Sequence, residues 1–327
     1  MTTLTSPHDL LAAVPFLIGY HPSDSLVLIT VNQNRLGMAM RIDYPIAVPA
    51  IAYQELFSHI SREECDGLLI VAYAPTKAKD SEAILAQLKD CASQSGIPIR
   101  ESIVVQNSRW RSLFCEDFEC CPPEGSELPE INSSRVAVEQ VADGNPMPHK
   151  DLADLVNSLA PLPIASDSEF IAQVEAARMS DEDPELKIKQ RAGAQAVDQL
   201  MSNFKMENSE LIAQVLGALC DIQVRDYALG LHREENIDHY WSNWRYLLRL
   251  APAGFVAPVA TIFAAISYER GYGAIAQKGL DRAFSDEAMY SLAGLLRRVF
   301  AAGWPPTALT QMRAELHPKV CDVIFGN

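Results

Sequence analysis

The stretch Ser25-Leu26-Val27-Leu28-Ile29-Thr30-Val31 (SLVLITV, residues 25–31) decides the fold of the first half of the chain. It is a continuous run of apolar and β-branched residues, which predicts a buried strand. A second run, Gly67 to Tyr73 (GLLIVAY), has the same character. Helical segments lie between the strands, so the two runs predict a mixed α/β sheet that is covered by crossover helices.

The segments around these two runs predict the element order β-β-α-β-α-β-β. Turn residues at 32–35 join the first strand to a second at 36–42, which makes a hairpin. The remaining predicted elements are helices at 49–63 and 79–95 and strands at 97–105 and 110–114, the last pairing across Asn107-Ser108.

The opening of the chain predicts a short helix ahead of the first strand. Thr5 or Ser6 can cap it, and Pro7 suits the first helical position. Pro15 is expected to end or kink this helix near Val14, because proline lacks the N–H that the helix needs.

The strand signals nearly stop after Gly125. Short helices at 133–143 and 150–159 are expected to close the first domain, and Ala160-Pro161-Leu162-Pro163 is the predicted linker. We therefore expect a mixed α/β domain over residues 1–162, with a cysteine-rich loop, and an all-α domain over residues 163–327. The helix candidates in the second domain are 185–205, 209–219, 221–231, 237–250, 254–270, 273–284 and 287–302.

Two of these helix candidates predict a close antiparallel pair. Small residues such as Ala265, Ala274 and Ala276 fall where the helices would cross, and Tyr268 and Phe284 are bulky residues near the ends. This pattern is similar to one tetratricopeptide (TPR) helical hairpin. No 34-residue period repeats upstream, so the second domain is predicted to be TPR-like or a generic helical bundle, and not a TPR array.

The composition excludes several classes of protein. The apolar content of 48% is typical of a globular chain, and the formal net charge of -15 would repel a phosphate backbone, so no nucleic-acid partner is expected. No apolar run approaches the length of a membrane span, and the opening lacks a basic segment of the secretory type. We therefore expect a cytoplasmic protein with reduced thiols.

The segment from Arg109 to Gly125 (RWRSLFCEDFECCPPEG) holds three of the seven cysteines within seven residues. Three thiolates with His21 or His149 as a fourth ligand could hold a metal ion, although the spacing is not that of a zinc ribbon. A reversible Cys115–Cys120 disulfide, a nucleophilic Cys115 and a packed structural loop are the other interpretations. The candidate ligand-binding residues of this segment are Arg109, Trp110, Cys115, Cys120, Cys121 and Glu124.

A second group of candidates surrounds the base of the predicted hairpin. The start of its first strand faces the end of its second, so polar residues from both should meet at one end of the sheet. They are Tyr20, His21, Asp24, Ser25, Arg41 and Asp43. Such a group could bind an anionic or sugar-like ligand or transfer protons, or it could be a structural network of ion pairs and caps.

The familiar catalytic motifs are missing from the sequence: it has no G-x-G-x-x-G, no P-loop, no H-E-x-x-H and no G-x-S-x-G. Asp221 and Arg225 are spaced for a local ion pair. The aromatic stretch that contains His232, His239, Trp241 and Trp244 is expected to pack in the core or at an interface.

Several segments taken together resemble the domain-of-unknown-function family 4192. They are residues 9–27 (DLLAAVPFLIGYHPSDSLV), 41–43 (RID), 109–125, 221–229 (DIQVRDYAL) and 271–284 (GYGAIAQKGLDRAF). The resemblance covers most of the chain and implies an uncharacterised bacterial protein, with no particular activity or cofactor. The chain departs from the family at Gly271-Tyr272-Gly273, where an acidic residue is expected between the glycines.

The sequence thus favours an interaction or regulatory protein, whose helical half binds a protein partner and whose α/β half carries a small-ligand site. The alternative is an enzyme or a metal or redox protein. Its site would join the loop of Cys115, Cys120 and Cys121 to the hairpin residues His21, Asp24, Arg41 and Asp43.

Overall fold

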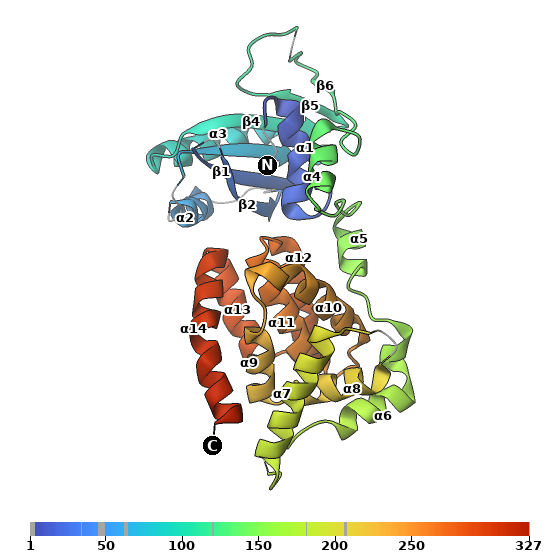
Figure 1. The fold of residues 1–327 in the computed structure, drawn as a ribbon. Helices are drawn as coiled ribbons and strands as arrows, with labels where there is room; N and C mark the ends of the chain where they lie inside the picture. The colour runs from blue at the N-terminus through green and yellow to red at the C-terminus, as the bar shows by residue number, and fades with distance from the viewer. Residues whose placement is uncertain are drawn as a thin grey trace. The chain divides into compact units, whose positions relative to one another are not determined.

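The computed structural model describes residues 4–33, 35–44, 50–61, 65–119, 121–180, 182–205 and 208–326. The chain divides into two compact units, Met1–Leu155 and Val156–Asn327. The first unit contains a sheet with helices, and the second unit is helical (Figure 1). The domain boundary at residue 162 stays a prediction.

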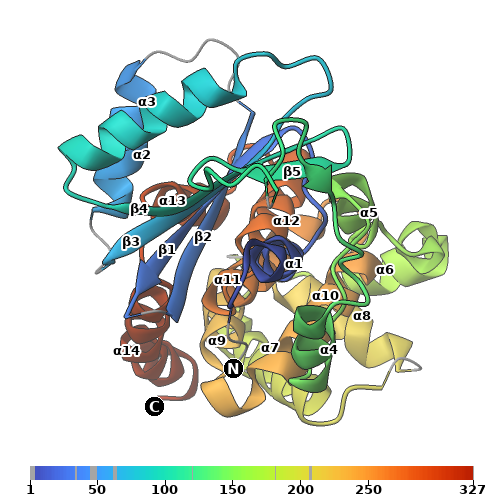
Figure 2. The same cartoon turned by 90° about the horizontal axis from the view of Figure 1, so that it is seen from above.

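The first unit is built on a mixed six-stranded sheet with the strand order β2-β1-β3-β4-β5-β6. Figure 2 shows strands β1 to β5 from above. Among the strands that the structure describes, only β3 and β4 are parallel neighbours, and the other neighbouring pairs are antiparallel. The mixed α/β fold predicted for this half is therefore confirmed. The strands are β1 (Ser25–Asn32), β2 (Arg35–Asp43), β3 (Gly67–Tyr73), β4 (Ile99–Gln106), β5 (Arg109–Ser112) and β6 (Ser126–Glu127).

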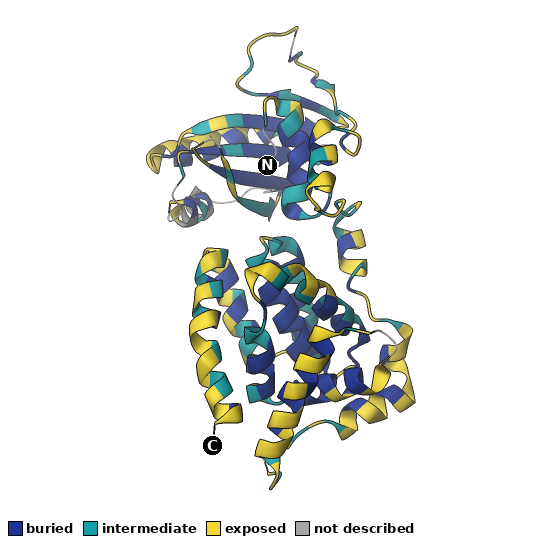
Figure 3. Cartoon of the chain, viewed as in Figure 1, coloured by how far each residue is buried: buried dark blue, intermediate teal, exposed yellow. Residues whose placement is uncertain are grey.

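Helices cover both faces of this sheet, as its buried central strands require. Leu28 of β1 and Ile70 of β3 belong to a core that includes Phe57 of α2 (Ala50–Ile60) and Leu88 of α3 (Ser81–Gln94). The opposite face includes Val27 and Val71, which are fully buried. Helix α1 (Pro7–Ile18) contacts β2 and also α4 (Arg135–Ala142). The central strands of the sheet are largely buried (Figure 3).

Helix α1 differs from its prediction in where it ends. It passes through Pro15 and runs to Ile18, where Gly19 closes it with a left-handed φ of 86°. The N-cap is Ser6, whose side chain accepts a hydrogen bond from the Asp9 N–H. Pro15 is buried, so we attribute the continuation to apolar packing that outweighs the loss of one helical hydrogen bond.

A two-residue turn joins β4 to β5. Asn107 and Ser108 adopt φ angles of 52° and 58°, the left-handed conformation at both central positions that suits the twist of a hairpin. This turn fixes the register, in which Gln106 pairs with Arg109 and Val104 pairs with Arg111. The fifth strand therefore begins one residue earlier than the predicted 110–114.

The second unit consists of helices, two of which the sequence did not predict. They are α6 (Ser168–Ala176) and the C-terminal α14 (Pro306–Phe325). Helix α14 begins with Pro306 and contains Pro318, which hides its helical signal. The other helices are α5 (Leu152–Asn157, which crosses the boundary of the units), α7 (Leu186–Ser202), α8 (Ser209–Ala218), α9 (Ile222–Gly230), α10 (Ile237–Leu250), α11 (Val256–Glu269), α12 (Gly273–Asp286) and α13 (Ser291–Ala301).

The ion pair predicted between Asp221 and Arg225 does not form. The Asp221 carboxylate instead caps α9 and accepts hydrogen bonds from the backbone N–H groups of Gln223 and Val224. The Arg225 guanidinium pairs with Asp226 and donates to the Tyr290 hydroxyl at 3.1 Å. A carboxylate at the N-terminus of a helix accepts hydrogen bonds from N–H groups that have no other partner, so the capping contact is favoured over the i,i+4 ion pair.

Helices α11 and α12 form the close pair that the small residues predict. A Cβ atom on Gly279 would lie 3.2 Å from the Cβ of Ala264 and 3.3 Å from the Ala260 carbonyl oxygen. The Asp286 carboxylate at the end of α12 accepts hydrogen bonds from the N–H groups of Gly254, Val256 and Ala257 at the start of α11. The pair is thus held at the helix crossing and at one end.

A buried group of charges joins α11 to α14. The Glu269 carboxylate accepts hydrogen bonds from Arg313 Nε at 2.9 Å and from Thr310 Oγ1 at 3.0 Å, and it lies 3.0 Å from His232 Nε2. The side chains of Glu269, Arg313 and His232 are 2%, 7% and 0% exposed. Arg313 also donates to the carbonyl oxygens of Gly230 and His232.

Removing the positive charge of this group should destabilise the helical unit strongly. We expect Arg313→Met to lower the free energy of unfolding by about 3–5 kcal/mol, because it leaves the Glu269 charge buried and only partly compensated. Urea unfolding measures the change, and the exposed Arg298→Met should cost less than about 0.5 kcal/mol. A cost for Arg313→Met as small as that of the control would contradict this account of the group.

The same group makes stability depend on pH. Burial lowers the pKa of His232 below its ordinary 6.5, so the unfolded chain takes up this proton at a higher pH than the folded chain. Burial alone would raise the pKa of Glu269, but its hydrogen bonds with His232 and Arg313 outweigh that effect and lower it. Both shifts make the free energy of unfolding fall as the pH drops.

We therefore expect the urea midpoint of the helical unit to be lower at pH 5 than at pH 7, and to fall further below pH 4.5. In a His232→Gln variant the difference between pH 7 and pH 5 should be smaller, because the group that gains a proton is gone. An equal difference in the variant and the parent chain would show that His232 does not contribute.

Candidate functional site

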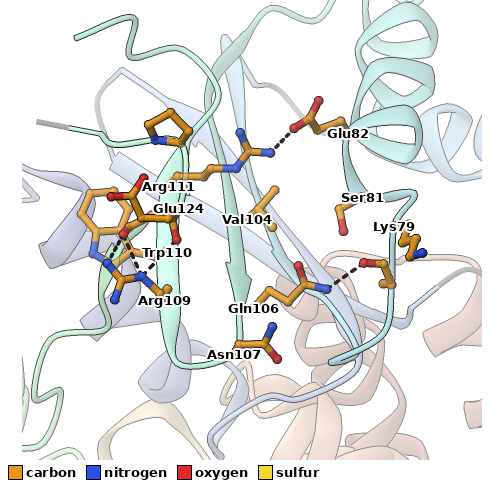
Figure 4. Close-up of a pocket in the computed structure, with 13 residues that line it drawn as sticks. Lys79, Ser81, Glu82, Val104, Gln106, Asn107, Arg109, Trp110, Arg111 and Glu124 are labelled. Atoms are coloured by element: carbon orange, nitrogen blue, oxygen red, sulfur yellow. Dashed lines mark hydrogen bonds and ion pairs between the residues drawn. The ribbon is translucent and has the colours of Figure 1, made fainter. Parts of the chain in front are cut away.

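A pocket of about 460 Å³ opens on the α3 face of the sheet (Figure 4). It lies where the parallel strands β3 and β4 end, between the first turn of α3, strand β5 and residues 123–125. Ligands of open α/β sheets commonly bind at the carboxyl ends of the strands. The polar and charged residues that line the pocket are Lys79, Ser81, Glu82, Gln106, Asn107, Arg109, Arg111 and Glu124.

Strand register places Arg109 and Arg111 on the pocket side of the sheet. Arg111 is paired with Val104, which belongs to the core under α3, and Arg109 is paired with Gln106. Residues directly opposite each other in a ladder share a face, and successive residues alternate between faces. The two arginines therefore face α3, and Trp110 between them faces the opposite side.

Arg109 fixes the wall of the pocket formed by residues 123–125. Its Nε donates to the carbonyl oxygens of Glu124 and Gly125 at 3.0 and 2.9 Å. Gly125 has a φ of 76°, and a Cβ there would lie 2.9 Å from the Trp110 carbonyl oxygen. Only glycine fits this position, so the chain can pass close along β5 and present Glu124 to the pocket.

Helix α3 begins at the pocket without a side-chain cap. Asp80 occupies the N-cap position, but its side chain makes no capping hydrogen bond. Its Oδ1 accepts instead from the Tyr44 hydroxyl at 3.1 Å, and the same hydroxyl lies 2.8 Å from Ser81 Oγ. The first-turn N–H groups of α3 therefore lack the carboxylate that commonly satisfies them, and they carry the positive end of the helix dipole.

The charges at the pocket are nearly balanced. Arg111 forms an ion pair with Glu82 of α3, whose side chain is mostly exposed. Lys79 is exposed, and none of the ion pairs found among the described residues involves it. Gln106 donates to the carbonyl oxygens of Pro75 and Ala78, which holds the segment between β3 and α3 in place.

The hairpin candidates lie on the other face of the sheet. Ser25 is paired with Asp43 of β2 on one side and with Tyr73 of β3 on the other. Tyr73 is in turn paired with Val105 of β4, and Val105 with Trp110 of β5, so these residues share one face. The Trp110 ring meets His8 of α1 edge to face, with centroids 5.0 Å apart. Within the described residues, Ser25 Oγ, the Tyr73 hydroxyl and Trp110 Nε1 are buried without a hydrogen-bond partner.

Tyr20 and Arg41 complete this second group. Arg41 forms an ion pair with Asp43 and also hydrogen-bonds the Tyr20 hydroxyl. Burial raises the pKa of Tyr20, and the positive charge of Arg41 partly offsets that rise. The prediction that these residues meet at one end of the sheet thus agrees with the contacts of Tyr20, Ser25, Arg41 and Asp43.

His21 and Asp24 have other neighbours. Burial lowers the pKa of His21, while a hydrogen bond with Asn132 and the charge of Glu130 oppose that shift. Asp24 is exposed with a φ of 43°, and its carbonyl oxygen accepts from the Tyr44 N–H at 2.9 Å. Asp24 therefore serves the turn before β1.

The cysteine-rich loop is described except at Cys120, so the interpretations that involve Cys120 lie outside the described residues. Cys115 is a free thiol with partial exposure, and its Sγ lies 3.9 Å from the Asp117 carbonyl oxygen. Cys121 is buried. In the described part of the chain, no three or more His, Cys, Asp or Glu side chains are grouped so that they could hold a metal ion.

The structure therefore divides the predicted site residues between the two faces of one sheet. Arg109, Trp110 and Glu124 line the pocket, although the Trp110 ring also contacts His8 of α1, whereas Tyr20, Ser25 and Arg41 belong to the α1 face. Sequence reasoning did not select Lys79, Glu82, Gln106, Asn107 and Arg111 as site residues. Their position in the sequence could have identified them as site residues, because Lys79 follows β3 and Asn107 follows β4, at the strand ends where ligands bind.

The fold and the pocket define a chain with a mixed α/β unit that carries a polar pocket and with a separate helical unit. None of its described helices is both long and apolar enough to span a bilayer. Residues 7–307 match the family described as "Domain of unknown function (DUF4192)", and the chain belongs to that family. No curated protein and no solved structure matches the chain.

The hydrogen bonds of Arg109 should hold residues 123–125, which form one wall of the pocket, in place. We expect Arg109→Met to release residues 113–125, because methionine keeps the apolar stem of the side chain but cannot donate to the carbonyl oxygens of Glu124 and Gly125. A protease specific for glutamate should then cleave this segment several-fold faster under native conditions. The control is Arg100→Met, which also removes a hydrogen bond to a backbone carbonyl, that of Asp66. Equal cleavage rates in the two variants would rule out this role for Arg109.

Proposed function

We propose that this protein is an interaction or regulatory protein whose α/β unit binds a small anionic ligand in the pocket beside α3. The observation that carries the proposal is the convergence of Lys79, Arg109, Arg111 and the uncapped start of α3 on one concave site. Helix N-termini and arginine side chains both favour negatively charged groups, and a pocket of this volume holds a small molecule.

The ion pair between Arg111 and Glu82 is compatible with ligand binding. Exposed ion pairs contribute about 0–1 kcal/mol, so a ligand can replace the Glu82 carboxylate at little cost. A ligand anion would then accept hydrogen bonds from the Arg111 guanidinium and from first-turn N–H groups of α3. Glu82 acts in this proposal as an internal competitor, and the amides of Gln106 and Asn107 supply neutral donors and acceptors.

The helical unit is proposed to be the TPR-like part that binds a protein partner. The close α11–α12 pair with Gly279 at its crossing supports this proposal, because such pairs stack into surfaces that bind proteins. The unit also exposes large apolar side chains, including Met289 at 89%, Ile188 and Ile222. A location in the bacterial cytoplasm belongs to the same proposal.

The alternative of an enzyme or a metal or redox protein stays a hypothesis. It requires the cysteine loop to join His21, Arg41 and Asp43. The contacts of the described residues favour the binding proposal instead, because Arg41 and Asp43 lie with Tyr20 whereas Cys115 follows the strand that carries the pocket arginines.

Two substitutions of opposite effect test the ligand site. We expect Arg111→Gln to weaken binding of the small anion at least tenfold, because a charge-assisted hydrogen bond is lost. Glu82→Gln should strengthen binding several-fold, because it removes the competing carboxylate. Isothermal titration calorimetry of the full-length chain with phosphate, glucose 6-phosphate and malate measures both effects.

The matched control for this experiment is Arg100→Gln. Arg100 lies at the opposite end of β4 and pairs with Asp66, so its loss changes the net charge equally without touching the pocket. An affinity in Arg111→Gln equal to that of Arg100→Gln, or no binding of any of the three anions to the parent chain, would refute the proposal.

A further inference from the structure

Three arginines of the helical unit gather around the backbone that follows α5. Arg245 and Arg249 lie one turn apart on α10, and Arg282 lies on α12. They donate to three consecutive carbonyl oxygens: Arg245 to Ser158 at 3.5 Å, Arg282 to Leu159, and Arg249 to Ala160 at 3.1 Å. Because neighbouring carbonyls of one chain are only a few ångströms apart, the three guanidinium groups share one small region.

The positive charge of this arginine cluster is not neutralised by carboxylates. In the described part of the chain, none of the ion pairs found involves Arg245, Arg249 or Arg282. Burial lowers the pKa of Arg282, and the charge of Asp286 opposes that shift, but the Asp286 carboxylate already accepts hydrogen bonds from three backbone N–H groups at the start of α11. The acceptors of the cluster are therefore neutral carbonyl groups, in a chain whose net charge is -15.

The like charges are close enough to act on one another. Burial and then the charge of Arg249 lower the pKa of Arg245, and Arg249 acts in the same direction on Arg282. Two like charges at i and i+4 on a helix are themselves destabilising. Holding three cations together therefore costs free energy, and a bound anion would offset this cost by reducing the repulsion between them.

The cluster also has unused hydrogen-bond donors. A guanidinium group has five N–H donors, whereas Arg245 makes one hydrogen bond, Arg249 one and Arg282 two with the described protein groups. The Nε of Arg245 is buried and has no partner among those groups. The three side chains are partly exposed, so an ion from solution can reach them.

The adjacent aromatic ring of Trp241 supports the geometry of the cluster. Arg245 lies over one side of this ring at 5.5 Å from its centroid, and the ring nitrogen donates to Ser267 Oγ at 2.9 Å. Stacking on a fixed ring limits the rotamers of Arg245, so less entropy is lost when its guanidinium binds an anion.

We propose that Arg245, Arg249 and Arg282 form a binding site for a small multivalent oxyanion of the phosphate type. Guanidinium groups match tetrahedral oxyanions through paired N–H donors, and three of them favour an anion with two or more charges over chloride. The bound anion accepts hydrogen bonds from the unused N–H donors and offsets the mutual repulsion of the arginines. It would thereby strengthen the hold of α10 and α12 on residues 158–160. This site is independent of the pocket beside α3.

The experiment is a calorimetric titration of the full-length chain with inorganic pyrophosphate, at an ionic strength held constant with sodium chloride. We expect saturable binding that Arg249→Gln weakens at least tenfold. Arg298→Gln should change it less than twofold, because Arg298 is an exposed arginine of α13 outside the cluster. If circular dichroism shows that Arg249→Gln does not fold, Arg245→Gln is the variant for the same comparison.

The Arg111→Gln variant distinguishes this site from the pocket of the α/β unit. Binding that persists in Arg111→Gln and is lost in Arg249→Gln supports the arginine cluster. Binding that is lost in Arg111→Gln and unchanged in Arg249→Gln would overturn this inference and leave the proposed function standing. No saturable binding to the parent chain would overturn it as well, and the three arginines would then serve only to hold the carbonyls of residues 158–160.

Discussion

The α/β unit depends on one constraint, which is the burial of β1, β3 and β4 on both faces. Strands of this kind need helices on each side, and the connections through α2 and α3 supply one of these layers. Side chains of successive residues then point to opposite layers. Arg109 and Arg111 consequently face α3, whereas Trp110 faces α1. A sequence segment that looks like one cluster is thereby divided between two environments, and only one of them is a pocket.

The helical unit relies on two carboxylates that each accept several hydrogen bonds, the buried Glu269 and the partly buried Asp286. Glu269 joins α11 to α14 through Arg313 and Thr310, and Asp286 joins the ends of α11 and α12 through three backbone N–H groups. A carboxylate that is shielded from water needs charged or N–H donors around it, so each of these contacts restricts how the helices can pack. Such contacts specify one arrangement among the many that apolar helices would otherwise allow.

Arginine side chains with free or exchangeable donors are the feature that both proposed sites share. The chain has a net charge of -15, so groups of basic side chains contrast with its overall charge. Arg111 with Lys79 beside α3 and the cluster of Arg245, Arg249 and Arg282 are two of them. In the first site Arg111 forms an ion pair with Glu82, whereas the arginines of the second site donate to neutral carbonyl groups. We infer that the first is suited to a ligand that exchanges readily, and the second to an anion that holds a backbone segment.

Elements that depend on local patterns could be predicted from the amino-acid sequence. The apolar runs at 25–31 and 67–73, the turn at Asn107-Ser108 and the small residues Ala265, Ala274 and Ala276 are visible in the chain because strand burial, turn conformation and helix crossing each restrict residue type locally. It did not reveal α14, whose prolines mask the helical period, or the capping role of Asp221, which competes with an equally plausible ion pair. The pocket was decided by tertiary structure alone. Lys79 and Glu82 at the start of α3, Arg111 on β5 and Glu124 come from three separate segments, and only the β3–β4 pairing and the β5 register bring them to one face. The same holds for Arg245 and Arg282, because contacts between distant segments are set by packing and leave no periodic signal in the sequence.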